Sequence, residues 1–272
     1  MKHHIPALGA LAATALLMAA PGAQAAFVTP TLTGVTTLSI CSPKLNLDTP
    51  TEQQNPATTT CRVEGLPGSA AVPGYIQRAA RSAPIVVNGV TIGTLYDRVW
   101  CLGTGTTCNA TNTYILGMRI NLNTAVWKAT TPFSFEVNDM FRAVRAATSA
   151  DIAYFNGTVV GGTLPDTAAA RKFLEYSGRT IKGLFEPSAE AQQFLNKARN
   201  NAWMDFRVDV NANDPDATAL SPTSPWSPWV FVRQVCPTGF NATPQPLKIR
   251  LRQGGEEGQL AQEILTSGYV CN

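Results

Sequence analysis

Residues 209–216, with the sequence DVNANDPD, carry oxygen-bearing side chains at spacings that can bind a cation. The oxygen donors of this octet are Asp209, Asn211, Asn213, Asp214 and Asp216. Calcium takes six to eight oxygen ligands, and alternating carboxylate and amide groups on a tight loop can supply several of them. Ca²⁺ is therefore the one cofactor that the sequence suggests.

The octet begins like an EF-hand calcium loop but does not continue as one. The sixth position of that loop is glycine, and here it is Asp214. The twelfth is a bidentate glutamate, and here it is Leu220. A polar turn that leaves a strand at Val210 explains the same residues, because Asx turns and Asp-Pro pairs need no metal. A looser calcium turn and a metal-free turn both stay open.

The position of the histidines restricts catalytic chemistry. His3 and His4 are the two histidines of the chain, and both fall within residues 1–25, which read as a cleaved signal peptide. A mature chain without histidine excludes Ser-His-Asp and Cys-His catalysis and the usual histidine-containing zinc and copper sites. Only carboxylate chemistry remains for an enzyme. The candidate carboxylates are Glu136 with Asp139, Glu175 and Glu186, and each also fits a cap, a turn or an exposed helix face.

Two tryptophans are candidates for ligand binding. Trp226 and Trp229 lie in the proline-rich segment 221–229. An aromatic face on a rigid loop suits a sugar ring or the apolar surface of a partner, because little conformational entropy is lost on binding. The alternative is that both indoles fold back over the core beside a strand at 229–235.

A basic stripe is the other candidate binding feature. Lys248, Arg250 and Arg252 alternate along a predicted strand and so share one face, roughly 7 Å apart. Such a stripe can meet an anionic polysaccharide or a phosphate. It can equally be a solvated face, or a sheet edge at which basic residues discourage pairing.

The N-terminal residues and the cysteines indicate where the protein goes. Residues 1–25 combine Lys2, an apolar run and the small-x-small site Ala23-Gln24-Ala25, which is typical of a bacterial secretory signal. The oxidising route favours three disulfides among the six cysteines. Sequence proximity favours the pairs Cys41–Cys61, Cys101–Cys108 and Cys236–Cys271. The protein is therefore predicted to be secreted, periplasmic or on the cell surface.

The elements that must hold these residues read as a mixture of strands and helices. Residues 26–60 are rich in threonine and proline and predict an extended arm. Strands are predicted on both sides of an Asn88-Gly89 hairpin, over 95–102 and 113–123 around a Cys101–Cys108 tip, and at 206–210, 229–235 and 247–251. Spacings of three and four residues predict helices over 70–82, 138–155, 167–176, 189–202 and 256–266. The fold class that follows is α+β and β-rich, with antiparallel sheets, helices inserted between strands and residues 61–272 as a single domain.

Composition favours a binding or structural role over catalysis. The chain has a formal net charge of +3, one unit of which is Lys2 in the predicted signal, and this gives no reason to expect a nucleic-acid or membrane partner. Charged residues make up 14% of the chain, below the roughly 25% of ordinary soluble domains. We expect a non-catalytic protein of the cell envelope or extracellular matrix that serves adhesion or assembly. Its expected partners are a glycan, a surface protein, or a second copy that receives the arm by strand addition. The alternative is a carboxylate-based hydrolase of extracellular or cell-wall glycans.

Overall fold

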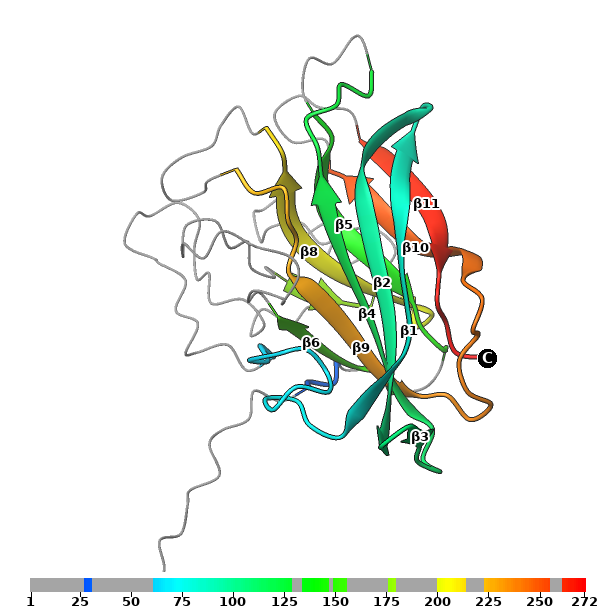
Figure 1. Cartoon of the computed structure of the whole chain (residues 1–272). Coiled ribbons are helices and arrows are strands. Elements are labelled where there is room, and N and C mark those ends of the chain that lie inside the picture. The colour runs from blue at the N-terminus through cyan, green and yellow to red at the C-terminus, as the bar shows by residue number, and fades with distance from the viewer. Residues whose placement is uncertain are drawn as a thin grey trace, which may run out of the picture.

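The computed structural model describes residues 27–30, 61–128, 134–146, 149–155, 176–179, 200–213, 223–254 and 261–272. These residues form two antiparallel sheets packed face to face, and they contain no helix (Figure 1). The described fold is therefore all-β, and the predicted α+β class is wrong.

The first sheet has the strand order β1-β2-β4-β9-β6, with the short strand β3 paired to β2. Its strands are β1 (Tyr75–Val87), β2 (Val90–Thr104), β3 (Thr107–Cys108), β4 (Thr113–Leu122), β6 (Asp151–Phe155) and β9 (Trp229–Val235). The second sheet has the order β11-β10-β5-β8-β7. Its strands are β5 (Glu136–Ala143), β7 (Tyr176–Gly178), β8 (Trp203–Asn211), β10 (Gln245–Gln253) and β11 (Gln262–Gly268).

The main core lies between the two sheets. Ile120 and Val232 of the first sheet and Phe206 and Leu251 of the second belong to the same fully buried cluster. A second apolar cluster belongs to the opposite, outer face of the first sheet. There Trp100 and Phe231 pack with residues of the preceding segment 61–74. The first sheet thus has apolar clusters on both faces, which explains why β4 and β9 show little alternation in burial.

Several predicted strands and both turn predictions are confirmed. Asn88 and Gly89 have φ values of 50° and 79°, as the primed hairpin turn between β1 and β2 requires. The Cys101–Cys108 disulfide closes the β2–β3 tip, and β2 pairs with β4 as predicted. The predicted strands at 206–210, 229–235 and 247–251 lie in β8, β9 and β10.

The predicted helix over 138–155 is replaced by two strands, β5 and β6. Every residue of β5 is buried, so its apolar residues do not alternate with polar ones as in a half-buried strand. Their spacing therefore resembled the period of a helix. Asn138, the first residue of the predicted helix, lies within β5 beside a register shift. Its side-chain amide donates to Glu136 Oε1 at 2.6 Å and its oxygen accepts from the backbone N–H of Gly254.

The other predicted helices fail wherever they can be compared. Residues 75–82 of the predicted helix 70–82 belong to β1, where pairing with β2 along the whole strand outweighs the helix propensity of its alanines. Residues 262–266 of the predicted helix 256–266 belong to β11. Tyr176 begins β7, and residues 200–202 precede β8 without being helical. The remaining residues of the predicted helices 167–176 and 189–202 lie outside the described residues.

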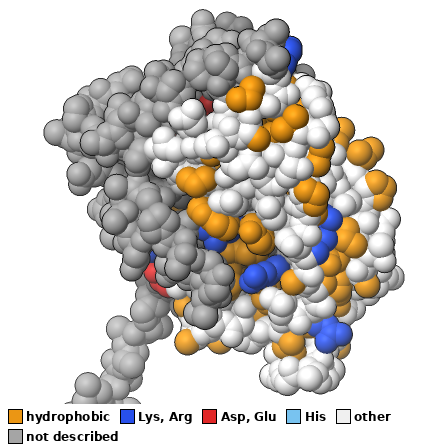
Figure 2. All heavy atoms as spheres, turned by 45° about the horizontal axis from the view of Figure 1, so that its top comes forward, with side chains coloured by type: hydrophobic (Ala, Val, Ile, Leu, Met, Phe, Trp, Pro, Cys, Tyr) orange, Lys and Arg blue, Asp and Glu red, His pale blue; other side chains and the backbone are white. Residues whose placement is uncertain are grey.

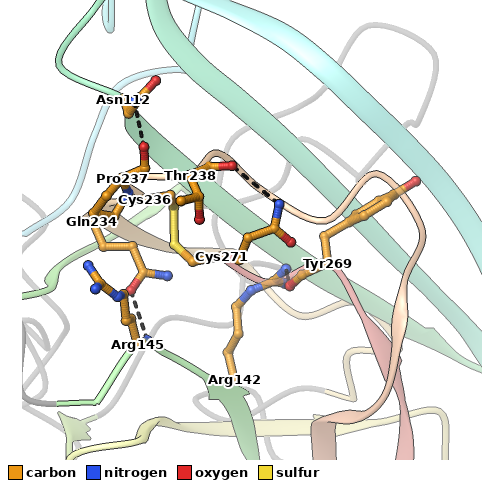
Figure 3. Close-up of a disulfide and its surroundings, with 10 residues drawn as sticks. Asn112, Arg142, Arg145, Gln234, Cys236, Pro237, Thr238, Tyr269 and Cys271 are labelled. Atoms are coloured by element: carbon orange, nitrogen blue, oxygen red, sulfur yellow. Dashed lines mark hydrogen bonds between the residues drawn. A yellow bond between two sulfur atoms is a disulfide. The ribbon is translucent and has the colours of Figure 1, made fainter.

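Two disulfides join described cysteines, and both are predicted pairs. Cys236 is bonded to Cys271 near the end of the chain (Figure 3), and Cys101 is bonded to Cys108. Cys61 is also disulfide-bonded, while its predicted partner, Cys41, lies outside the described residues. Disulfides of this kind indicate an oxidising extracellular or periplasmic environment. None of the described segments forms a helix long and apolar enough to cross a membrane.

A buried ion cluster joins the two sheets beside the second disulfide. Asp97 of β2 forms an ion pair with Arg142 of β5 at 2.9 Å and with Arg81 of β1 at 3.5 Å. Asp97 also accepts the backbone N–H of Tyr269. The carbonyl oxygen of Tyr269 accepts from Arg142, and both residues are drawn in Figure 3. The cluster therefore holds strands of both sheets and the segment before Cys271 together.

The described part of the N-terminal arm lies on the free edge of β6. Val28 and Ile152 exchange two backbone hydrogen bonds of 2.9 and 2.8 Å in an antiparallel bridge. The hydroxyl of Thr29 donates to Asp151, and Phe27 packs near Phe231 with its ring 4.5 Å from the Arg233 guanidinium. Residues 27–30 thus extend the first sheet by one short strand-like segment.

Candidate binding site

The segment before β9 presents Trp226 on the outer face of the first sheet. Backbone hydrogen bonds tie this segment to β4, from Leu122 N–H to Pro225 O at 2.8 Å and from Ser227 N–H to Ile120 O at 3.1 Å. The Trp226 indole stacks on the Tyr96 ring of β2, with 5.7 Å between centroids and 28° between planes. Trp226 is half-buried, so the residue keeps some contact with solvent while the backbone beneath it is fixed.

Arg119 of β4 fixes the same indole. Its guanidinium lies 4.2 Å from the centroid of the Trp226 ring, a distance suited to a cation–π interaction. Its Nε donates to Ser227 O at 3.1 Å, and the side chain is 3% exposed. Burial lowers the pKa of Arg119 to about 10, and the nearby Arg98 contributes to the lowering. At neutral pH this guanidinium still carries its positive charge.

Arg98 lies next to this aromatic group on β2. Its guanidinium is 4.9 Å from the centroid of the Trp229 ring, and burial lowers its pKa. Arg98 is paired across the sheet with Gly117, where a Cβ atom would lie 2.8 Å from the Trp100 ring and 2.9 Å from Phe231. The lack of a side chain at Gly117 is therefore what allows these two rings to fill the sheet face beside Arg98.

The electrostatic character of this site is cationic. Neither Arg98 nor Arg119 forms an ion pair with an acidic side chain in the part of the chain that the structure describes. Figure 2 shows a face of the molecule on which basic side chains lie directly among hydrophobic ones. We call Tyr96, Arg98, Arg119 and Trp226 the aromatic–arginine site. Its residue types suit a ligand with an apolar ring face and an electron-rich or anionic group.

The two predicted tryptophans have different environments. Trp229 is 2% exposed and packs edge-on against Trp100 at 6.2 Å, as expected for an indole that covers the core. Trp226 is the half-exposed member of the pair. Sequence reasoning did not identify Tyr96, Arg98 or Arg119 as site residues. The alternation Tyr96-x-Arg98-x-Trp100 within a predicted strand was a usable signal, because it places three such side chains on one face.

The predicted basic stripe lies on β10 in the second sheet. β10 is paired on both sides, with β11 and with β5, so the stripe is not at a sheet edge. Arg250 forms an ion pair of 3.5 Å with Glu263, and its guanidinium lies 5.5 Å from the centroid of the Trp203 ring. Arg252 is half-buried near the carboxylate of Asp205. At least part of the charge of this stripe is therefore matched by acidic groups of the protein itself.

The predicted calcium octet is only partly described. Asp209 and Asn211 belong to β8 rather than to a loop, and Asn211 Nδ2 donates to Asp209 Oδ1 at 3.4 Å. Asn213 follows the strand, and its carbonyl oxygen accepts from the Ser134 hydroxyl at 3.4 Å. Asp214 and Asp216 lie outside the described residues. No cluster of three or more His, Cys, Asp or Glu side chains suited to a metal ion occurs within the described ranges, and calcium at this octet stays a prediction.

Two of the predicted carboxylates, Glu136 and Asp139 of β5, lie on the second sheet. Asp139 is fully buried near Asp205 of β8, which the sequence did not suggest, and burial together with the charge of Asp139 raises the pKa of Asp205 well above its usual range. These carboxylates lie on the opposite sheet from Trp226, so the described residues do not combine them with that indole. Glu136 is buried and accepts from Asn138, while Glu175 and Glu186 lie outside the described residues.

A shallow groove also lies on the outer side of the first sheet. It has a volume of about 610 Å³ and is lined by the start of β1, the end of β2, including Trp100, and residues 66–68. None of the residues that line it carries a formal charge. The groove therefore offers shape and backbone polar groups but no acid–base chemistry.

Searches for similar proteins find no matching family model, no matching curated protein and no matching solved structure.

Proposed function

We propose that the protein is a secreted, non-catalytic binding protein that holds a sugar ring of an extracellular or cell-envelope glycan against Trp226. The observation that carries the proposal is the half-exposed indole of Trp226, stacked on Tyr96 and held by Arg119. A ring fixed in this way loses little conformational freedom when a ligand covers it. The disulfides and the predicted signal peptide support an extracellular or periplasmic place of action.

The test is affinity electrophoresis of the mature, oxidised protein in gels that contain single polysaccharides. The panel consists of dextran, dextran sulfate, polygalacturonate and its methyl ester. We expect at least one polysaccharide to retard the protein, and we expect Trp226→Ala to remove the retardation, because it deletes the exposed ring. Trp203→Ala is the matched control, since Trp203 is also a half-exposed indole beside an arginine but lies on the second sheet. Retardation that survives Trp226→Ala would assign binding to another surface.

We further propose that residues 27–30 can join two copies of the chain by strand exchange. The observation that favours this is the Val28–Ile152 bridge, in which a short terminal segment is held to β6 by two backbone hydrogen bonds, next to residues 61–63, which bond to Tyr154 on the same edge. The 30 residues between Pro30 and Cys61 give the segment the contour length to reach a neighbouring molecule. The same contacts then form between chains instead of within one.

Size-exclusion chromatography after incubation at high protein concentration tests this assembly. We expect dimers or larger species from the mature chain and only monomer from a variant that lacks residues 26–30. Val28→Pro is the point-mutant counterpart, because proline cannot donate the N–H that Ile152 O accepts. Equal elution of all three forms at every concentration would contradict assembly through this segment.

A further inference from the structure

We propose that the glycan bound at the aromatic–arginine site is anionic, and that Arg98 binds its carboxylate or sulfate group. This inference rests on the proposed function, because it names the class of ligand for the same site. It differs from the basic stripe suggested by the sequence, which lies on the second sheet.

The position of Arg98 on β2 brings it within reach of a ligand that covers Trp226. Tyr96 and Arg98 are two residues apart on β2, so their side chains leave the same face roughly 7 Å from each other. Tyr96 is the ring on which Trp226 stacks. Tyr96, Arg98 and Trp226 are all half-exposed, so a ligand can touch an indole and a guanidinium at the same time.

The Arg98 guanidinium is also held in place. It lies 4.9 Å from the centroid of the buried Trp229 ring, which restricts the motion of a side chain that is otherwise flexible. A planar guanidinium presents parallel N–H groups that match the two oxygens of a carboxylate or of a sulfate. Packing against the indole leaves the edge of the guanidinium, which carries these N–H groups, as the part that can meet an anion.

Charge balance sets Arg98 apart from several other arginines of the sheets. Arg142, Arg233 and Arg250 each have a carboxylate within 3.5 Å, at Asp97, Asp151 and Glu263 respectively. Arg98 has no such partner among the described residues, although it is partly removed from water and lies near the equally unpaired Arg119. Two like charges in a partly desolvated site repel each other, and a bound anion relieves that repulsion.

The experiment compares polygalacturonate with its methyl ester, because the two polymers share a backbone and differ in the charge of the carboxyl group. Dextran sulfate and dextran form a second pair that separates sulfate from carboxylate recognition. Dissociation constants are obtained from mobility against polysaccharide concentration. We expect Arg98→Gln to weaken binding to the preferred anionic polymer roughly 10- to 100-fold, the usual effect of losing a charge-assisted hydrogen bond. We expect Arg98→Lys to recover only part of that loss, since lysine keeps the charge but not the fork.

Lys248→Gln is the matched control for net charge, because Lys248 is a half-buried cation on the second sheet. An equal loss in Lys248→Gln would mean that binding follows overall charge or uses the basic stripe of β10, and either result would overturn the inference. Equal binding of a neutral polymer and its anionic counterpart, unchanged in Arg98→Gln but abolished in Trp226→Ala, would also overturn it while leaving the proposed function intact. Failure of the wild-type protein to bind any polymer of the panel would count against both.

Discussion

Removing the charge of Asp97 tests how the two sheets are held together. Asp97→Asn keeps the size of the side chain and an oxygen for the backbone N–H of Tyr269, but it leaves Arg142 as a buried cation without its counter-ion. Asp97 is 0% exposed and Arg142 is 1% exposed. Nε and Nη1 of Arg142 have no hydrogen-bond partner, so the ion pair carries most of the compensation for burying this guanidinium. Breaking such a pair costs about 3–5 kcal/mol.

The assay is equilibrium unfolding in urea and thermal unfolding, both with the disulfides intact. For a domain of this size, each kcal/mol lowers the midpoint temperature by about 2–4 °C, so we expect Asp97→Asn to lower it by roughly 6–20 °C. Glu64→Gln is the matched control. It breaks the Arg62–Glu64 pair, which has a similar distance of 3.3 Å but a glutamate side chain that is 65% exposed. We expect this control to change stability by about 0–1 kcal/mol.

A second variant separates lost charge pairing from lost packing. Arg142→Met in the Asp97→Asn background no longer buries an unpaired guanidinium, so we expect it to recover part of the lost stability. The reasoning is refuted if Asp97→Asn is no more destabilising than Glu64→Gln. It is also refuted if the stability lost in the double variant equals the sum of the losses in the single variants Asp97→Asn and Arg142→Met.

Three further predictions concern other parts of the molecule. Because the pKa of Asp205 is raised in the folded state, ionised Asp205 destabilises the fold increasingly as the pH rises above the ordinary carboxyl range. We expect Asp205→Asn to raise the unfolding midpoint at pH 7.5 and to raise it less and less as the pH is lowered to 4, so a gain that does not depend on pH would contradict this. Gly117→Ala places a methyl group against the Trp100 and Phe231 rings, so we expect the free energy of unfolding measured in urea to fall by about 1–3 kcal/mol and the tryptophan fluorescence to change. Wild-type values for both would show that the rings move aside freely. If the octet binds calcium, adding calcium but not magnesium to the EDTA-treated protein should raise the unfolding midpoint, and Asp209→Ala should abolish the rise. Equal midpoints with and without calcium would reject the hypothesis.

The features that local chemistry determines were predictable from the sequence. Asn88-Gly89 fixes a tight hairpin because both residues accept a positive φ, and the short Cys101–Cys108 spacing fits one hairpin tip. The helices were not predictable in the same way, because the apolar period of residues 138–155 arises from two adjacent strands. The polar residues that broke the strand pattern, among them Asp139 and Arg142, are buried rather than exposed.

The candidate site was predictable only in its exposed aromatic residue. Trp226 was identified from its place in a proline-rich segment. Its partners come from β2 and β4, more than a hundred residues earlier in the chain, and only the pairing of those strands brings Tyr96 and Arg119 together. No local pattern specifies that Ser227 will bond to Ile120 and set the indole over this pair. Long-range register therefore decides the site.

The place of β9 between β4 and β6 has a consequence for the newly made chain. β4 and β6 are synthesised before β9, and about a hundred residues separate the end of β4 from the start of β9. At ordinary rates of synthesis this is a delay on the order of 5 to 20 s, during which β4 has an unpaired edge and one face of large apolar side chains. An incomplete first sheet of this kind readily pairs with other chains. We therefore expect the nascent protein to need a holding chaperone until β9 has been delivered, and overproduction to yield aggregates in which β4 pairs between molecules.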